Sequence, residues 1–353
     1  MSMLKIKKFL RHTNKDVYIL AAPLVLVTSV MIIGVASYYV LAPTDPEKNA
    51  AVLQIERGII PGQSLASRTI DDDLLESVAR IDAKPALTDV QLVPIDTLIN
   101  VPHPQTLVLV IKQAGVSHAY PLSVLDQHEV VNSTIAGTPI LITFCAPCRT
   151  VSVFERKIGK QTLQFGNAGA TYRDVLVVYD TVSYSLWDQI RGQALDGSKQ
   201  GSELSLLPSQ ILTFAEWSKE AGEQYLLVRS TNESVGYTLA DTSVSEFFSQ
   251  NPDSRTSTYS GLDAANELVV GITVNGVTKA YPIKPLKSKI FFDNFGSAIV
   301  EISGNQSGHG VRVVRKSTRG QAPEPVSTVT TTWKSWTAMY PHSLRYQAVE
   351  NTQ

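Results

Sequence analysis

The chain has 353 residues, with 31 Lys and Arg against 32 Asp and Glu and only two cysteines. Hydrophobic residues make up 43% of the chain, which excludes a wholly disordered protein because enough apolar surface is present to offset chain entropy. The balanced charge argues against a nucleic-acid binder, since no basic excess is available to neutralise phosphates. Two cysteines exclude a small disulfide-stapled scaffold. At about 100–200 residues per domain, the length predicts two or three domains.

The amino terminus contains an uncharged segment of 26 residues, 17–42. A helix needs about 20 apolar residues to cross a bilayer. Residues 1–16 carry five basic residues and one acidic residue, which predicts that this tail stays in the cytoplasm. A cleaved signal peptide is the alternative, but its apolar region spans about 7–15 residues and ends in small side chains. We therefore expect a single-pass anchor, with the remaining chain periplasmic or extracellular.

Residues 43–90 are predicted to be a tether, because Pro43, Pro46 and Pro61 interrupt regular structure. Within this tether, three aspartates precede the sequence LLESVARI at 74–81. Acidic residues stabilise the positive end of a helix, so this pattern predicts a short helix.

From residue 90 onward, short runs rich in β-branched residues alternate with Gly, Asn, Asp and Pro, which is typical of antiparallel β structure. The clearest runs are 107–112, 140–144, 151–154, 175–179 and 226–229. Hairpin turns are predicted at 157–160 and at 274–277, where Asn275-Gly276 suits a type I′ turn. Short helices are predicted at 213–220 and 243–249. The expected fold is mainly β with a few short helices.

The chain contains an internal similarity at a constant offset. Residues 115–122 read GVSHAYPL and residues 276–283 read GVTKAYPI. Later in each copy, TFAEW at 213–217 matches TWKSW at 332–336. Ordered self-similarity indicates duplication, the alternative being chance likeness between two hairpins. The predicted domains are a first β module at 91–230, a linker at 231–261 and a degenerate second module at 262–353.

The first copy alone holds the cysteines, in the motif Cys145-Ala-Pro-Cys148. Strand-like residues lie on both sides, which places the motif on a turn and argues against a thioredoxin-like centre, where C-x-x-C opens a helix. Three interpretations stay open. Outside the cytoplasm the thiols favour a disulfide, structural or redox-active. Alternatively, thiolates suit copper or zinc, or the two cysteines are simply buried and free.

His128 is the best candidate for a third metal ligand, since it lies 17 positions before Cys145. A closed tetrahedral site needs four ligands, and the motif supplies only two. His118 and His309 are weaker candidates, and a hydrogen-bonded histidine without a metal is the alternative for each.

The first copy also contains an insertion, residues 172–197, that is rich in polar and aromatic side chains. Aromatic rings beside a few fixed polar groups are typical of small-ligand pockets. The expected ligand-binding residues are Arg173, Asp180, Trp187, Gln189 and, beside the thiols, Arg149. The alternative is a β-hairpin whose Trp fills the core and whose Asp residues cap turns. No nucleophile elbow, phosphate loop or dinucleotide motif occurs, so no catalytic residue is assigned and enzymatic activity is left open.

A set of motifs resembles the "domain of unknown function 3179" family. These motifs are H-E-V-V-N at 128–132, I-T-F-C-A-P-C at 142–148, F-G-N-A-G-x-x-Y at 165–172, Y-D-x-x-S-x-S-L-W-D-Q at 179–189 and T-F-A-E-W at 213–217. The resemblance spans residues 90–345 and implies an exported or membrane-tethered protein without an established activity.

The resemblance also implies which positions are characteristic of the family. They are His128, Asn132, Cys145, Cys148, Gly166, Gly169, Asp180, Ser185, Leu186, Trp187 and Gln189. The chain departs from the pattern at Ser133, Arg149, Ser183 and Asp188, where Asp, Gly, Thr and Ser are usual. A cation at position 149 favours a thiolate or narrows access to the thiols.

Together these features predict a membrane-anchored extracytoplasmic protein with a Cys145–Cys148–His128 site. The expected role is metal handling, with copper or zinc as the cofactor, or thiol redox chemistry with a protein partner in the envelope. The alternative is a non-catalytic ligand-binding or assembly module in which the two cysteines form only a structural disulfide.

Overall fold

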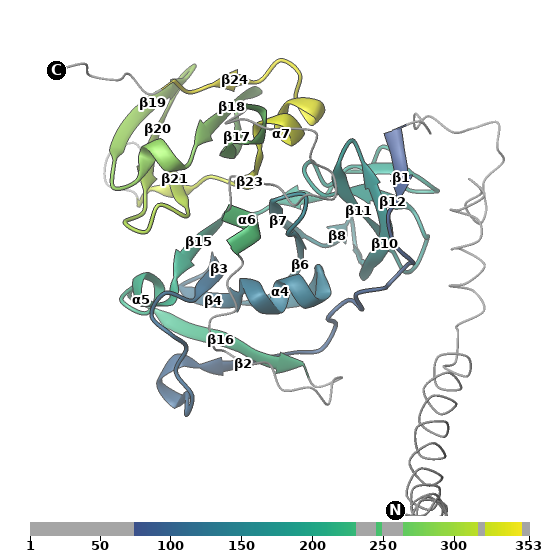
Figure 1. The fold of residues 1–353 in the computed structure, drawn as a ribbon, viewed down its shortest axis with the longest axis horizontal. Helices are drawn as coiled ribbons and strands as arrows, with labels where there is room; N and C mark the ends of the chain where they lie inside the picture. Colours follow the sequence, from purple (N-terminus) through teal and green to yellow (C-terminus); the bar gives the residue numbers. More distant parts are fainter. Residues whose placement is uncertain (1–73, 231–244, 249–263, 317–321, 348–353) are drawn as a thin grey trace, which may run out of the picture. The chain divides into compact units, whose positions relative to one another are not determined.

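The computed structural model describes residues 74–230, 245–248, 264–316 and 322–347 (Figure 1). The predicted anchor at 17–42 and most of the tether lie outside this range. Within the described part, no helix is long and apolar enough to span a membrane. The chain is mainly β, as the sequence predicted.

Four sheets and one small hairpin make up the described chain. The first sheet has the order β1 (Leu75–Ser77), β10 (Phe165–Tyr172), β11 (Val175–Asp180), β12 (Leu186–Asp188) and β13 (Ala194–Asp196). The second runs β24 (Leu344–Arg345), β18 (Val277–Pro282), β17 (Leu268–Val274), β23 (Val329–Thr332), β7 (Thr150–Glu155), β6 (Thr138–Cys145) and β5 (Val130–Ile135), with β14 (Ser205–Leu206) also on β7.

The third sheet has the order β15 (Ser209–Thr213), β3 (Leu107–Gln113), β4 (Val116–Pro121), β16 (Glu223–Ser230) and β2 (Val90–Pro94). The fourth is β19 (Ile290–Phe295), β20 (Ala298–Gly304), β21 (Val311–Arg315) and β22 (Glu324–Pro325), and the small hairpin is β8 (Lys157–Ile158) with β9 (Gln161–Thr162). The described helices are α4 (Leu122–His128), α5 (Phe214–Trp217), α6 (Ser245–Phe248) and α7 (Trp333–Met339), with 3-10 turns η3 (Ile95–Thr97), η4 (Ala264–Asn266) and η5 (Lys284–Leu286).

Two sets of four strands share one arrangement. In the third sheet, β3 pairs antiparallel with β15 and β4, and β16 lies parallel to β4. In the second sheet, β17 pairs antiparallel with β23 and β18, and β24 lies parallel to β18. The predicted turn at Asn275-Gly276 is confirmed, because both residues have positive φ, 50° and 77°, as a type I′ turn requires.

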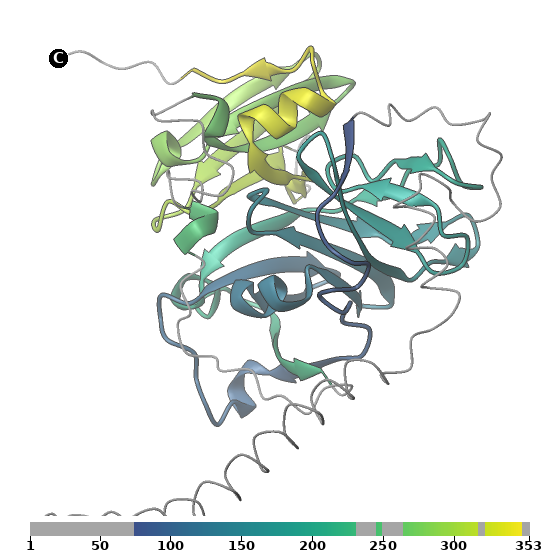
Figure 2. The same ribbon diagram turned by 45° about the vertical axis from the view of Figure 1, so that its right-hand side comes forward.

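Helices begin at the same place in both sets. Thr213 caps α5 by accepting a hydrogen bond from the backbone of Glu216, and Thr332 caps α7 by accepting one from the backbone of Ser335. The predicted helix at 213–220 is confirmed as the shorter α5, and the described residues of the predicted helix at 243–249 form α6. Helix α4 was not predicted; it packs on β3, β4 and β6 (Figure 2).

The helix predicted within 74–81 is wrong at residues 75–77. These residues form β1, which pairs antiparallel with the edge of β10, with Glu76 opposite Thr171. Backbone pairing with a distant strand satisfies the hydrogen-bonding groups that a single helical turn would have left open.

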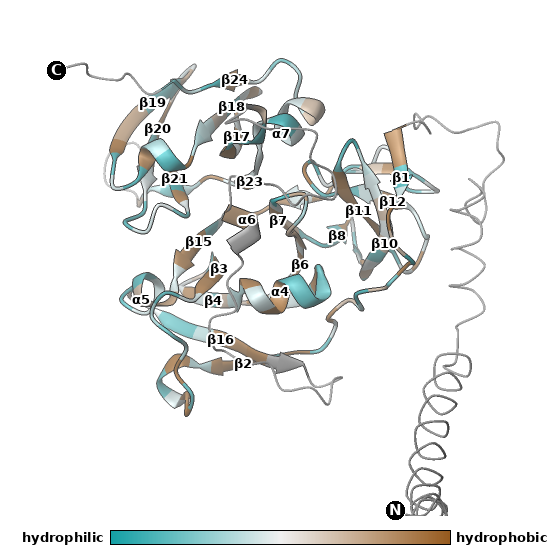
Figure 3. Cartoon of the chain, viewed as in Figure 1, coloured by the Kyte–Doolittle hydropathy of each residue, from teal (hydrophilic) through white to brown (hydrophobic). Residues whose placement is uncertain are grey.

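The largest core cluster joins residues from both predicted modules, including Leu109 of β3 and Val270 of β17. The hydropathy of α4 changes along its length, with apolar residues at its start and polar residues at its end (Figure 3). Leu122 and Leu125 are fully buried, which fixes α4 against this core. The helix therefore delivers its polar last turn to the edge of the sheet that carries the cysteines.

Candidate functional site

The cysteines lie on the connection between β6 and β7, as the sequence predicted. Cys145 ends β6, opposite Thr150, which begins β7. The two residues form a disulfide, with 5.2 Å between their Cα atoms. Backbone bonds also close the turn: the Arg149 N–H donates to Ala146 O at 3.0 Å.

The two cysteine residues differ in burial. Cys145 is 4% exposed and packs among Leu141, Phe154 and Trp187. Cys148 is only partly buried at the edge of the same cluster. Its backbone N–H donates to the Sγ atom of Cys145 at 3.1 Å. Cys145 therefore belongs to the core, and Cys148 is the less buried of the two cysteines.

The side chain of Arg149 extends from the turn toward α6 and η4 of the same chain. Its Nε donates to Phe247 O at 2.8 Å and its Nη1 donates to Asn266 O at 2.6 Å. The residue is 5% exposed, and burial lowers the pKa of its guanidinium to about 10. The side chain thus ties the turn to α6 and η4.

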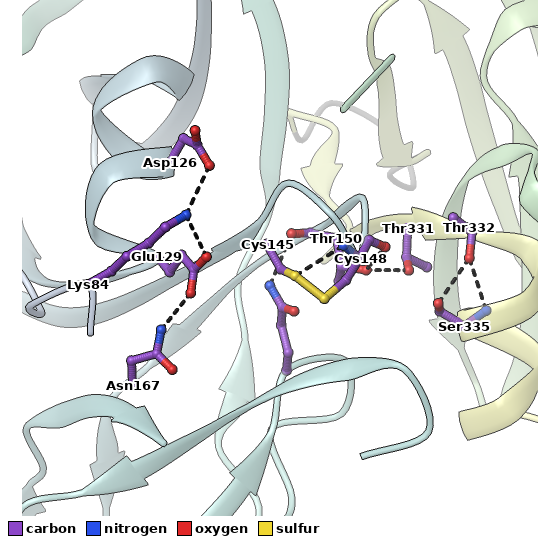
Figure 4. The surroundings of a disulfide bond; sticks show 11 residues. Lys84, Asp126, Glu129, Cys145, Cys148, Thr150, Asn167, Thr331, Thr332 and Ser335 are labelled. Atoms are coloured by element: carbon purple, nitrogen blue, oxygen red, sulfur yellow. Dashed lines mark hydrogen bonds and ion pairs between the residues drawn. A yellow bond between two sulfur atoms is a disulfide. The ribbon is translucent and has the colours of Figure 1, made fainter. Parts of the chain in front are cut away.

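Thr150 connects the turn to a strand of the second predicted module. Its hydroxyl donates to Cys148 O at 3.0 Å and lies 2.7 Å from the hydroxyl of Thr331 in β23 (Figure 4). Next to it, Val151 pairs with Thr330 and thereby joins β7 to β23. Gln189 donates from Nε2 to Thr150 O at 3.0 Å, while its buried Oε1 has no hydrogen-bond partner among the described residues.

His128 is the last residue of α4 and is 2% exposed. Its Nδ1 lies 2.8 Å from the carbonyl oxygen of Pro85, a hydrogen-bonding contact. Among the residues that the structure describes, no three His, Cys, Asp or Glu side chains form a group that could hold a metal ion. The structure therefore does not assemble His128, Cys145 and Cys148 as a three-ligand set.

A polar cluster lies beside the disulfide (Figure 4). The Lys84 ammonium is 2.7 Å from Glu129 and 3.3 Å from Asp126, and Asn167 donates to the other oxygen of Glu129 at 2.5 Å. Burial alone lowers the pKa of Lys84, but the hydrogen bond and charge of Glu129, with the charge of Asp126, raise it overall. Glu129 itself has φ 60°, a left-handed conformation that non-glycine residues seldom adopt.

Sequence reasoning missed this cluster. Glu129 and Asn167 lie within the motifs H-E-V-V-N and F-G-N-A-G, but neither was singled out as a site residue. Lys84 lies in the segment assigned to the tether, where no local pattern signals its contact with Glu129.

The predicted ligand cluster of the insertion is divided by the β10–β11 hairpin. Arg173 lies at its tight turn and donates to Ala338 O at 2.9 Å, whereas Asp180 pairs with Phe165 at the other end. Six residues of extended strand separate these ends, about 17 Å. Arg173 and Asp180 therefore do not face one pocket.

Asp180 and Trp187 form a structural unit. The Asp180 carboxylate accepts from the Ser183 N–H at 2.6 Å, the Ser183 hydroxyl at 2.5 Å and the Trp187 indole at 3.1 Å. The Asp188 carboxylate likewise closes a turn, since it accepts a hydrogen bond from the Arg191 backbone N–H at 2.6 Å. Burial raises the pKa of Asp188, and this effect outweighs the lowering by Arg191. These contacts match the alternative in which Asp residues cap turns and the Trp fills the core.

The fold and site define a mainly β protein whose C-x-x-C disulfide connects two adjacent strands. The chain belongs to the family described as "Protein of unknown function (DUF3179)", whose model matches residues 81–323. The resemblance stated from the motifs is thereby confirmed. Comparison with curated proteins and with solved structures gives no match.

Proposed function

We propose that Cys145 and Cys148 are a redox-active pair that exchanges electrons with a dithiol partner outside the cytoplasm. The observation that carries this proposal is the weakness of the disulfide as a staple. For a sequence separation of 3, the chain-entropy model gives about 2 kcal/mol, against about 5 kcal/mol for a loop of about 100 residues. Strand pairing and the bond from Arg149 N to Ala146 O already hold the turn.

The difference in burial assigns the two sulfurs separate roles in this proposal. A partner thiolate attacks the Sγ of Cys148, the less buried of the two cysteines. The S–S bond breaks, and Cys145 leaves as a thiolate that takes up a proton. The partner's second thiolate then attacks the partner sulfur of the mixed disulfide, and Cys148 leaves as a thiolate that takes up a proton. The partner is thereby oxidised to a disulfide and the pair is reduced by two electrons.

Metal handling is the second candidate, because reduced thiolates bind copper or zinc. Only the two sulfurs support it, since no third ligand is grouped with them in the described part of the chain. This candidate therefore predicts binding to the reduced protein alone.

The location is also part of the proposal. An uncharged segment at 17–42 behind a basic tail supports a signal anchor with the β modules outside the cytoplasm. Protease added to intact spheroplasts should then digest the chain beyond residue 45, and complete protection would overturn this topology.

We further propose that the modules at 91–230 and 262–353 are duplicates. The shared strand arrangement and the matching threonine caps support this. So do two tyrosines at the repeat offset: the hydroxyl of Tyr120 bonds Ser133 in β5 at 2.9 Å, and that of Tyr281 bonds Asp293 in β19 at 2.7 Å.

The redox proposal is tested by the reduction potential of the pair in the full-length chain. A redox-active pair should equilibrate between about −120 and −270 mV, whereas structural disulfides lie below about −300 mV. In cells, Cys145→Ser should accumulate a mixed disulfide through Cys148, and Cys148→Ser should accumulate much less. The double serine variant is the control.

The outcomes separate the three interpretations. A potential below the redox range with no mixed disulfide would leave the pair a structural staple and favour the binding-module alternative. Stoichiometric Cu(I) or Zn(II) binding by the reduced chain, lost in Cys145→Ser, would favour metal handling instead.

A further inference from the structure

A polar hollow of about 400 Å³ lies between the β15–α5 corner and the loop joining β20 to β21. Its lining includes Gln105, Glu216, Lys219, Lys287, Gln306 and His309. It shares no residue with the disulfide or with the polar cluster around Glu129. The side chains come from both predicted modules, so the hollow exists only where the modules meet.

The loop that forms one wall is held rigidly. The Asn305 side-chain oxygen accepts from the backbone N–H groups of Gly308, His309 and Gly310 at 2.9, 3.0 and 3.1 Å. Its amide nitrogen donates to Ile211 O in β15 at 3.1 Å. A Cβ atom on Gly310 would lie 2.2 Å from that same carbonyl oxygen, so the loop and strand are in direct contact. The wall is therefore in place before any ligand arrives.

Glu216 is the acidic residue that lines the hollow, and both of its carboxylate oxygens already accept hydrogen bonds from the protein. One oxygen accepts from the backbone and hydroxyl of Thr213 at 2.9 and 3.0 Å, and the other accepts from the Ser307 N–H at 2.8 Å. Partial burial alone would raise the pKa of Glu216, but these hydrogen bonds lower it overall, so the group is a carboxylate at neutral pH. Its role is to join the loop to α5.

Other side chains that line the hollow can still donate hydrogen bonds to a ligand. Neither Lys219 nor Lys287 forms an ion pair with another described residue, although both line the hollow. The Nδ1 atom of His309 is buried and has no hydrogen-bond partner in the described chain. Burial and the charge of Lys287 lower the pKa of this imidazole against the effect of Glu216, so the ring is neutral. Two ammonium groups, two carboxamides and an imidazole thus surround one space.

We propose that this hollow binds a small polar molecule bearing carboxylate or phosphate groups, with Lys219 and Lys287 as its cationic partners. Charge-assisted hydrogen bonds from ammonium groups to such oxygens are stronger than neutral ones. The volume falls in the range of about 300–1,000 Å³ that holds small ligands. The carboxamides of Gln105 and Gln306 suit hydroxyl or further oxygen atoms of the ligand. The proposal is independent of the redox role of Cys145 and Cys148.

The test measures binding of inorganic phosphate and of citrate to the full-length chain by calorimetry, with sucrose as a neutral probe. The double variant Lys219→Gln/Lys287→Gln should bind the preferred anion about tenfold more weakly, since it loses two charge-assisted hydrogen bonds that solvent screens in part at a surface. The matched control is Lys284→Gln/Lys289→Gln, which removes two positive charges from exposed positions that flank Lys287 and do not line the hollow. It should change the affinity less than about twofold, because exposed charges without direct contact to the ligand are screened by salt.

The site also has a direct spectroscopic readout. The preferred anion should shift the imidazole NMR signals of His309 and leave those of the exposed His103 unchanged. Tighter binding of citrate identifies a carboxylate ligand, and tighter binding of phosphate identifies a phosphate ester. Equal binding by both double variants, tighter binding of sucrose, or an unmoved His309 signal would each overturn the proposal.

Discussion

The β6–β7 turn and the β20–β21 loop lie at corresponding places under the proposed duplication, but they are closed by different chemistry. In the first, a disulfide joins Cys145 to Cys148. In the second, the side-chain oxygen of Asn305 accepts three backbone N–H groups and closes the loop without a covalent bond. A connection at this place in the scaffold therefore does not need a disulfide to be ordered. The comparison favours a chemical role for the cysteines over a purely structural one.

A second comparison concerns the hairpins themselves. In the first, His118 lies 3.4 Å from the Tyr120 hydroxyl, a long contact between neutral groups. In the second, Lys279 is 2.5 Å from Asp293, which also accepts from the Tyr281 hydroxyl. The shared tyrosine fixes the hairpin on the core, and the residues around it differ in charge. The two copies should therefore respond differently to pH.

The largest expected effect tests whether the two copies share one core. Trp217 is 0% and Trp336 is 1% exposed, so replacing either with Ala should lower the free energy of unfolding by about 3–5 kcal/mol. Because the largest apolar cluster contains residues of both modules, each variant should still unfold in a single transition. Denaturant unfolding followed by two probes measures this. Trp333→Ala, at a partly buried position, is the control with a smaller loss, and two separated transitions would contradict the shared core.

The second prediction concerns Arg149, which connects the β6–β7 turn to α6 and η4. Arg149→Met removes two hydrogen bonds and leaves the carbonyl oxygens of Phe247 and Asn266 without this donor. Each unsatisfied buried group costs about 1–3 kcal/mol, so the unfolding free energy should fall by about 2–4 kcal/mol. Arg312→Met, at an exposed position, should change it by less than about 0.5 kcal/mol. A loss no greater than that of the control would mean that Arg149 does not hold the turn to α6 and η4.

The β architecture was readable from the sequence because its signals are local. Runs of β-branched residues, Asn275-Gly276 and the strand-like flanks of Cys145 and Cys148 each act over a few residues. The helix predicted for LLESVARI is wrong at Leu75–Ser77, because these residues pair with β10, a strand far along the chain.

The candidate site could be predicted only in part, because several of its contacts join residues that are far apart in the sequence. The C-x-x-C spacing alone identifies the two cysteines as candidates. The contact of Lys84 with Glu129 cannot be recognised in this way, because it joins the segment predicted as a tether to the end of α4. The grouping of Arg173 with Asp180 failed because strand register places them at opposite ends of one hairpin. The hollow between the modules has no sequence signal, since it depends on how the β20–β21 loop meets β15.

The third prediction concerns His118, where the second copy has Lys279. Burial lowers the pKa of His118 to about 4, below the usual value of 6.5. The unfolded chain therefore binds a proton that the folded chain does not, and stability falls as the pH drops from 6.5 to 4. We expect this contribution to be about 1–3 kcal/mol, because His118 is only 8% exposed and one pKa unit corresponds to about 1.4 kcal/mol. His118→Gln should flatten thermal stability over that range, while His103→Gln should not. An unchanged slope in His118→Gln would contradict the effect.

The smallest expected effect concerns Asp293, where the first copy has Ser133. Partial burial raises the pKa of Asp293, but hydrogen bonds from Lys279 and Tyr281 and the charge of Lys279 lower it below its usual 3.8 overall. The carboxylate therefore stabilises the fold above the unfolded pKa, and this contribution is lost as the pH falls through the folded pKa. Because each side chain of the pair is 19% exposed, solvent still screens the interaction in part, and we expect no more than about 1 kcal/mol. Wild type should exceed Asp293→Asn in stability at pH 6, and the difference should vanish toward pH 2. Ser133→Ala, which removes the uncharged counterpart, should show a difference from wild type that does not change with pH in this range, so a pH-independent loss in Asp293→Asn would show that its charge adds nothing to the hairpin.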